Sequence, residues 1–168
     1  MPRLRSNETL LSHDELLRAL RYEPDTGLFY RRESRGCKKA GSPSGWKVTR
    51  GYVCVGVGAM QFTAHRLAWL YMTGAWPLGV IDHINGDTSD NRWANLRDVP
   101  HAVNCENQRN ARRSNASGYL GVTMFKGRPR ASIRVKRKLL HLGTFDTVEQ
   151  AHEAYLAAKR RLHEGCTI

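Results

Sequence analysis

The sequence predicts an α+β fold made of two parts, and three observations support this prediction. A β-branched run at 80–84 and a second strand candidate at 95–99 flank a polar loop, and a helix-forming segment follows them. Farther along, residues 131–135 alternate between apolar and polar side chains, and the apolar stripe of an amphipathic helix follows Thr147. The segment 111–117 is small, polar and basic, as linkers are. We therefore expect an N-terminal α/β extension over 1–60, a core unit over 61–110, a linker over 111–117 and a C-terminal domain over 118–168.

The N-terminal extension opens with a helix signal, because Ser12 and Glu15 have the spacing of a capping box. Leu16, Leu17 and Leu20 give this helix a short apolar face. The expected elements are a helix at 13–21, a turn at 24–27, a strand at 28–32, a loop at 33–50 and a hairpin that turns near Gly58.

The core unit is expected to begin with a helix at 64–72, which Gly74 and Pro77 end. Pro100 suits the first turn of a later helix, because its missing N–H would be unpaired there in any residue. That helix would run to about Asn110. The expected order is helix 64–72, strand 80–84, turn 85–87, loop 88–94, strand 95–99 and helix 100–110.

Asp82 and His83 are neighbours on the predicted strand, so their side chains point to opposite faces and can flank a scissile phosphate. One carboxylate and one Asn carbonyl from the following helix would supply two hard oxygen ligands, which suit Mg²⁺. A neutral imidazole, with a pKa of about 6.5, is the natural general base for an attacking water. A lone Asp-His pair is more often structural, so the surrounding motifs decide its interpretation.

Several motifs in order resemble one family. They are His65–Trp69 (His-Arg-Leu-Ala-Trp), Ile81–Asp87 (Ile-Asp-His-Ile-Asn-Gly-Asp), Asp90-Asn91, Asn95–Arg97 and Asn104. Together they resemble the HNH endonucleases, in the phage and homing-endonuclease branch where Asn replaces the final His. That family has a ββα-metal fold, which agrees with the predicted strand–loop–strand–helix order. The resemblance implies hydrolysis of DNA phosphodiester bonds with Mg²⁺ or Mn²⁺.

The resemblance also implies roles for single residues. Asp82 and Asn104 correspond to the metal ligands, and His83 corresponds to the general base. Asn95 corresponds to the middle Asn, which braces the loop through hydrogen bonds to the backbone. Asn107 follows Asn104 by about one helical turn and is a fallback ligand.

Three other polar residues are interpreted as structural. Asn91 is expected to fix a turn after Asp90. His65 is expected to pack or to cap a helix, and His101 lies near the start of the site helix; a role in the site stays open for both.

The C-terminal domain is expected to be a three-stranded antiparallel sheet packed on one helix. Strands are predicted at 117–122, 131–135 and 139–145, and Thr147 and Gln150 form a capping box at the start of the helix. A narrow basic sheet fits the major groove of DNA. The predicted DNA-binding residues, on the open sheet face or its hairpin rims, are Lys126, Arg128, Arg130, Arg134, Lys136, Arg137 and Lys138.

This domain resembles the AP2 DNA-binding domain. The motifs are Gly118–Val122, Ala131–Arg134, Leu142–Phe145 and Thr147–Ala151 followed by Ala154-Tyr155. Thr123 replaces the family's arginine, His141 replaces its aromatic residue, and the first hairpin lacks its tryptophan. The resemblance therefore implies DNA binding, with Arg134 as the base-contacting residue, and it does not imply the family's target sequence. Within the basic run of this domain, we expect Lys136, Arg137 and Lys138 to contact phosphates.

The charge of the chain favours a polyanionic partner. Lys and Arg number 27 against 15 Asp and Glu, which gives a net charge of +12. Residues 111–168 contribute +8 of this excess, from 12 basic and 4 acidic side chains. Nucleic acid is the usual partner of such a chain, and an anionic membrane is the lesser option. No apolar run is long enough to span a membrane and no signal peptide is expected.

Four dispersed cysteines without a C-x-x-C pair fit the cytoplasm, which would be a bacterial host's if a phage encodes the chain. Double-stranded DNA is the expected partner, and the oligomeric state, monomer or homodimer, stays open. Two alternative functions remain: a DNA-binding regulator with an inactive HNH fold, and an RNA-binding accessory protein. The intact set of Asp82, His83 and Asn104 favours the nuclease.

Overall fold

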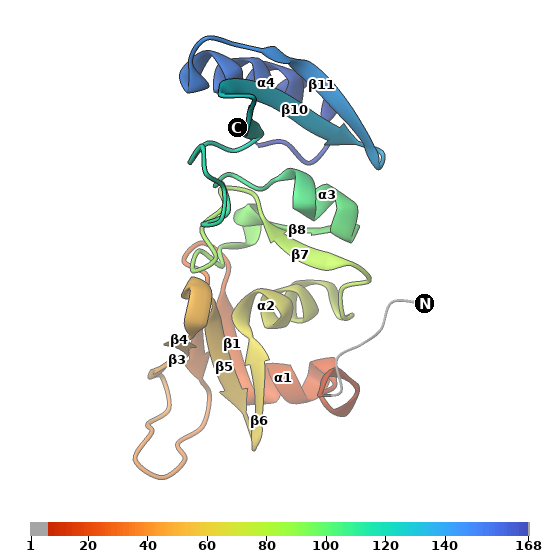
Figure 1. Cartoon of the computed structure of the whole chain (residues 1–168). Coiled ribbons are helices and arrows are strands. Elements are labelled where there is room, and N and C mark those ends of the chain that lie inside the picture. Colours follow the sequence, from red (N-terminus) through yellow and green to blue (C-terminus); the bar gives the residue numbers. More distant parts are fainter. Residues whose placement is uncertain (1–6, 168) are drawn as a thin grey trace. The chain divides into compact units, whose positions relative to one another are not determined.

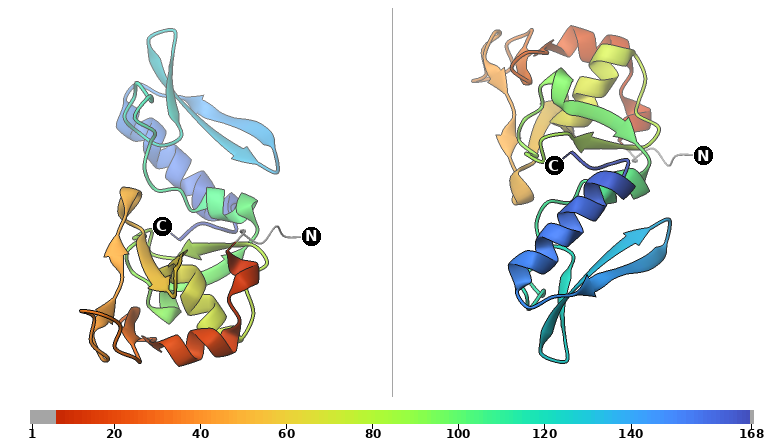
Figure 2. Two further views of the ribbon diagram at one scale, coloured as in Figure 1. Left: turned by 90° about the horizontal axis from the view of Figure 1, so that it is seen from below. Right: turned by 90° about the horizontal axis from the view of Figure 1, so that it is seen from above.

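The computed structural model describes residues 7–167, so the first six residues of the predicted N-terminal extension, and Ile168, lie outside the described residues. The chain divides into two compact units, Met1–His101 and Ala102–Ile168 (Figures 1 and 2). Each unit mixes helices and sheet, which confirms the α+β class. The division differs from the predicted one, because nearly all of the helix expected to close the core unit belongs to the second unit.

The first unit begins with η1 (Glu8–Leu10) and α1 (His13–Ala19). The predicted capping box is confirmed, since Ser12 Oγ accepts from the Glu15 amide and Ser12 N donates to the Glu15 carboxylate. The helix was expected to reach residue 21. It ends earlier because Leu20 starts a strand, in which Leu20 and Tyr22 are buried on alternate positions.

Two small antiparallel sheets follow α1. One has the order β1-β2-β3 and the other β4-β5-β6. The predicted turn at Gly58 is confirmed by its φ of 61°. The predicted loop at 33–50 is partly wrong, because it contains two short strands and the turn η2 (Thr49–Gly51). The strands are β1 (Leu20–Glu23), β2 (Leu28–Arg31), β3 (Pro43–Ser44), β4 (Trp46–Lys47), β5 (Val53–Val57) and β6 (Met60–Thr63).

The core of the first unit forms around α2 (Ala64–Thr73), as the sequence predicts. Leu67 and Ala68 are fully buried against apolar side chains of the strands, and Gly74 ends the helix in a left-handed conformation with φ 76°. Arg66 of the same helix forms a buried ion pair with Glu8, which ties η1 to the core.

A two-stranded hairpin completes the first unit. It consists of β7 (Val80–His83) and β8 (Leu96–Val99), joined by a loop that ends in η3 (Trp93–Asn95). The strands pair antiparallel with Asp82 opposite Arg97 and His83 opposite Leu96. The predicted strand–loop–strand order is therefore confirmed.

The second unit contains a three-stranded antiparallel sheet packed on α4 (Val148–Leu162). It also contains α3 (His101–Glu106) except for its first residue, because the unit begins at Ala102. Ala131 and Ile133 of the central strand are buried against Ala151 and Tyr155 of α4. The sheet order is β11-β10-β9, with β9 (Val122–Phe125), β10 (Arg128–Val135) and β11 (Lys138–Thr144). This arrangement confirms the predicted sheet and helix (Figures 1 and 2).

Three predicted boundaries in this unit are wrong. The central strand, expected from residue 131, already begins at Arg128. The helix expected to reach Asn110 ends at Glu106. The first strand, expected from residue 117, begins only at Val122, because the Ser117 hydroxyl bonds to the carbonyl groups of Tyr119 and Val122 and holds this stretch in turns. Among residues 7–167, no helix is both long enough and apolar enough to cross a membrane.

Candidate active site

The β7–β8 hairpin places Asp82 and His83 at the centre of the candidate site. Both side chains are buried although both are polar, at 6% and 4% exposure. Their partners differ: Asp82 pairs across the hairpin with Arg97. His83 instead meets Tyr52 just before β5, His65 of α2 and Asn91 in the loop after β7. These different contacts agree with the expectation that side chains of neighbouring strand residues point to opposite faces.

Asp82 is held in place by an ion pair. Its Oδ2 accepts hydrogen bonds from Nε and Nη2 of Arg97, at 2.9 and 2.7 Å. A carboxylate offers about four acceptor positions, so this pair is compatible with metal coordination by the same group. The pair also places a positive charge beside this buried carboxylate.

His83 is packed among aromatic rings. Its ring centroid lies 5.2 Å from that of His65 and 6.1 Å from that of Tyr52. Its Nε2 lies 3.4 Å from Oδ1 of Asn91. Burial lowers the pKa of His83 below its usual value near 6.5, and the Asn91 contact opposes this shift only in part. The imidazole is therefore neutral at pH 7, which is the form that a general base requires.

Asn95 fixes the loop that follows His83. Its Oδ1 accepts from the Asn85 amide at 2.9 Å, and its Nδ2 donates to the Asp90 carbonyl at 2.8 Å. The family resemblance implies hydrogen bonds of this type, which brace the loop, at the position of Asn95. Arg92 adds a bond to each oxygen of the Asp90 carboxylate, and these bonds hold the pKa of Asp90 down at about 2.

Sequence reasoning gave Asn91 and Tyr52 no role in the site. Asn91 was expected to fix a turn, and for His65, which was expected to pack or cap, a role in the site stayed open. All three lie against the imidazole of His83. The Tyr22 hydroxyl donates to the Asn91 carbonyl at 2.6 Å, and this bond positions Asn91 from the distant strand β1. Only the pairing of distant segments reveals these contacts, so no local motif could have indicated them.

The predicted helix residues lie in a different unit. Asn104 is half-buried on α3, whereas Asp82 and His83 belong to the first unit. Asn107, the fallback ligand, lies beyond the end of α3, and its side-chain oxygen accepts from the Thr167 hydroxyl. His101 is exposed at the first position of α3.

The carboxylate of Asp82 is a donor that suits a hard divalent cation. Within residues 7–167 no three His, Cys, Asp or Glu side chains gather into a cluster of metal ligands. Asp82 is buried and offers hard oxygen donors. Mg²⁺ is commonly held by one or two carboxylates, with water and substrate phosphate as its other ligands, so a single carboxylate of this kind suits it.

The predicted DNA-binding cations occupy the sheet of the second unit. Burial alternates along β10, with Pro129, Ala131 and Ile133 buried while Arg130 and Arg134 are more exposed. The Arg130 guanidinium lies 3.4 Å above the centre of the Phe125 ring. Arg128 and Lys138 begin β10 and β11, and Arg128 forms an exposed ion pair with Asp146.

Three more of these cations form the hairpin turns. Lys126 joins β9 to β10, and Lys136 and Arg137 join β10 to β11. Their φ angles are 48°, 45° and 69°, so each has the left-handed backbone that residues other than glycine rarely adopt.

Comparison with known proteins agrees with the hairpin geometry. Residues 62–106 match the family model described as HNH endonuclease. The match runs from β6 to the last residue of α3 and includes Asp82, His83, Asn95 and Asn104. No curated protein and no solved structure matches the chain. Residues 62–106 are therefore an HNH endonuclease domain, and this domain implies that the protein is a nuclease.

Proposed function

We propose that this protein is a divalent-metal-dependent endonuclease that hydrolyses phosphodiester bonds of double-stranded DNA. The observation that carries the proposal is the burial of His83 next to Asp82, inside the span that matches the HNH endonuclease family. Because Asn104 stands where other HNH enzymes have His, we assign the chain to the phage and homing branch.

In the proposed reaction, His83 accepts the proton of the attacking water. Its low pKa keeps the imidazole ready for this step at pH 7, and Asn91, His65 and Tyr52 hold the ring in one orientation. Asp82 and Asn104 would hold Mg²⁺ or Mn²⁺, and a bound ion supplies stabilisation of charge on the phosphate and the leaving oxygen. The pairing of Asn104 with Asp82 rests on the family resemblance.

The sheet of the second unit would bind the duplex as an AP2-like module. Two-residue hairpin turns with both φ angles positive favour Asn-Gly, yet the β10–β11 turn has Lys136 and Arg137. Residues held in a sparsely populated conformation point to a functional demand at that position. Phosphate contact by these two cations meets that demand, and Lys126, Lys138, Arg128 and Arg130 extend the basic surface.

Arg134 is the proposed base-reading residue. It is exposed on β10, on the strand face opposite the buried Ile133, and lies across from Leu139 of β11. An arginine in the major groove can bond both acceptors of a guanine, and such a contact discriminates by about 1–3 kcal/mol. Loss of Arg134 should therefore relax the preference at one base pair.

A plasmid assay tests the proposal. The purified protein should nick or linearise supercoiled plasmid DNA with Mg²⁺ and should be inactive in EDTA. His83→Ala should cut about 10²–10⁴-fold more slowly, the usual contribution of a general base. His141→Ala removes an exposed imidazole from β11 and serves as the matched control, with cleavage unchanged. A wild-type protein that binds DNA without metal-dependent cleavage would instead be a DNA-binding regulator with an inactive HNH fold.

A further inference from the structure

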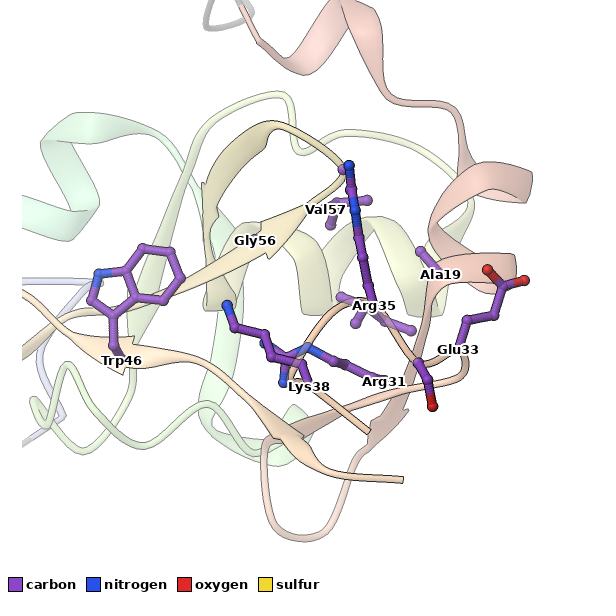
Figure 3. A pocket seen from close by; sticks show the side chains of 11 residues that line it. Ala19, Arg31, Glu33, Arg35, Lys38, Trp46, Gly56 and Val57 are labelled. Atoms are coloured by element: carbon purple, nitrogen blue, oxygen red, sulfur yellow. The ribbon is translucent and has the colours of Figure 1, made fainter. Parts of the chain in front are cut away.

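The first unit contains a basic pocket that the nuclease site does not use. It is a cavity of about 520 Å³ between β2, β4, β5 and the loop after β2, and its polar wall consists of Arg31, Glu33, Arg35 and Lys38. Trp46, 42% exposed, forms an aromatic wall. Figure 3 shows Arg35 and Lys38 between the indole of Trp46 and the carboxylate of Glu33. A cavity with several cations and one exposed aromatic side chain suits a nucleic-acid backbone.

The charge around the pocket is strongly one-sided. Segment 31–47 contains six basic residues and one acidic residue, Glu33. Among residues 7–167, the ion pairs that the structure contains include none of these six cations. Six cations against one carboxylate raise the local positive potential, so this segment attracts an anionic partner.

The loop that carries Arg35 and Lys38 is ordered by its own hydrogen bonds. Arg35 and Lys38 exchange two backbone hydrogen bonds, at 2.8 and 3.1 Å, across a tight turn. The Ser34 hydroxyl accepts from the Ala40 amide at 2.9 Å, and the Arg31 guanidinium donates to the Pro43 carbonyl at 2.6 Å. Two cations on a braced loop lose less entropy on binding than two on a mobile one.

The pocket continues toward the catalytic histidine. Trp46 also lines a second cavity of about 190 Å³, together with Lys47, Ser89 and Asn91. Asn91 is the residue whose Oδ1 lies 3.4 Å from His83 Nε2. Trp46 thus lines both cavities, and Asn91 connects the second cavity to His83.

The approach of β4 and η2 to the catalytic loop supports this continuity. A Cβ on Gly51 would lie only 2.9 Å from the Thr88 hydroxyl. Hydrogen bonds from Ser89 lower the pKa of Asp87, and the positive charge of Lys47 adds to this effect. Lys47, at the end of segment 31–47, therefore lies close enough to the loop after His83 to act on its charge.

We propose that the basic pocket binds phosphates of duplex DNA next to the bond that is cleaved, through Arg35 and Lys38, with Trp46 against the deoxyribose. The pocket is thus a second DNA contact, on the nuclease unit itself and separate from the sheet of the second unit. This inference rests on the proposed function, because it takes duplex DNA as the substrate.

Lysine footprinting of the full-length protein tests the contact directly. Reaction with an acetylating reagent, followed by peptide mass spectrometry, is compared with and without a 30-base-pair duplex in EDTA. Lys38 should be several-fold less reactive when DNA is bound. Lys159 is buried and provides the unreactive reference. If Lys38 reacts equally with and without DNA while lysines of the second unit are protected, the pocket is not a DNA contact.

A pair of charge variants gives the second readout. Arg35→Gln with Lys38→Gln removes two cations from the pocket, so the slope of log affinity against log salt should fall by about 1.8 at roughly 0.9 per phosphate. Arg18→Gln with Arg21→Gln removes two exposed cations from α1 and β1 of the same unit and should leave the slope unchanged. Equal slopes for the wild type and the pocket variant overturn the inference.

The two proposals fail in different ways. A protein that neither binds nor cuts duplex DNA refutes the proposed function and this inference together. A protein that cuts DNA with Mg²⁺, while Lys38 stays unprotected and the slope is unchanged, refutes only the inference about the pocket.

Discussion

Replacing the residues of the β10–β11 turn should stabilise the protein and lower its affinity for DNA. Lys136 and Arg137 have φ angles of 45° and 69°, in a turn that Asn-Gly would form without strain. A left-handed backbone costs about 1–2 kcal/mol for a residue with an ordinary side chain. Lys136→Asn with Arg137→Gly should therefore raise the free energy of unfolding by about 1–2 kcal/mol, since Asn and Gly both tolerate this conformation.

The same change removes two proposed phosphate contacts. At about 0.9 per phosphate, the slope of log affinity against log salt should fall by roughly 1.8. Stability is measured by urea denaturation, and affinity by fluorescence anisotropy of a labelled duplex between 50 and 200 mM KCl. A turn whose only role is to connect two strands would give the stability gain with no change in slope.

Arg160→Gln with Arg161→Gln is the matched control for this experiment. It removes two exposed cations from the last turn of α4, the helix that covers the opposite face of the sheet. The net charge changes equally, but the salt slope should stay at the wild-type value. If both variants lower the slope equally, the effect comes from net charge, and the reasoning about the turn is wrong.

Three further predictions follow from single contacts. His65→Phe keeps a ring beside His83 but removes the imidazole nitrogens, and we expect cleavage to slow by at least about tenfold with the Mg²⁺ titration unchanged. Gly121→Ala should destabilise the protein by more than about 2 kcal/mol in thermal unfolding, because φ is 78° and a Cβ would lie 2.0 Å from the Tyr155 ring. The acid limb of the pH profile of kcat/KM should lie below about pH 6.5, because burial lowers the pKa of His83. The base is lost only when the pH falls through that lowered pKa. An acid limb above pH 7 would contradict a buried neutral base.

Local signals predict much of this fold. The capping box at Ser12, the glycine that ends α2 and the strand pair around Asp82 each depend on residues close together in sequence, and the structure contains all three. The alternation along β10 likewise predicts its buried face, because side chains of a strand alternate regardless of what the rest of the chain does.

Long-range contacts account for what the sequence did not predict. The rings of His65 and Tyr52 reach His83 from segments 18 and 31 residues away, so no spacing rule applies to them. The end of α3 at Glu106 has a similar cause, because the backbone and side chains beyond it bond to the C-terminal segment. Asn107 bonds to Thr167, and the Gln108 carbonyl accepts from the buried Lys159. Tertiary contacts of this kind override a helix signal at the end of a segment.

The most direct test of the account is the binding of Mn²⁺ to the protein–DNA complex. Calorimetric titration of Mn²⁺ into the His83→Ala protein with bound duplex avoids cleavage, and it should show one metal site per chain. Adding Asp82→Asn or Asn104→Ala should weaken that site by at least about tenfold. Asp82→Asn preserves the shape of the side chain but replaces a charged carboxylate with a neutral amide, and Asn104→Ala removes an amide oxygen. Wild-type Mn²⁺ affinity in both of these variants would contradict the assignment of Asp82 and Asn104 as the metal ligands.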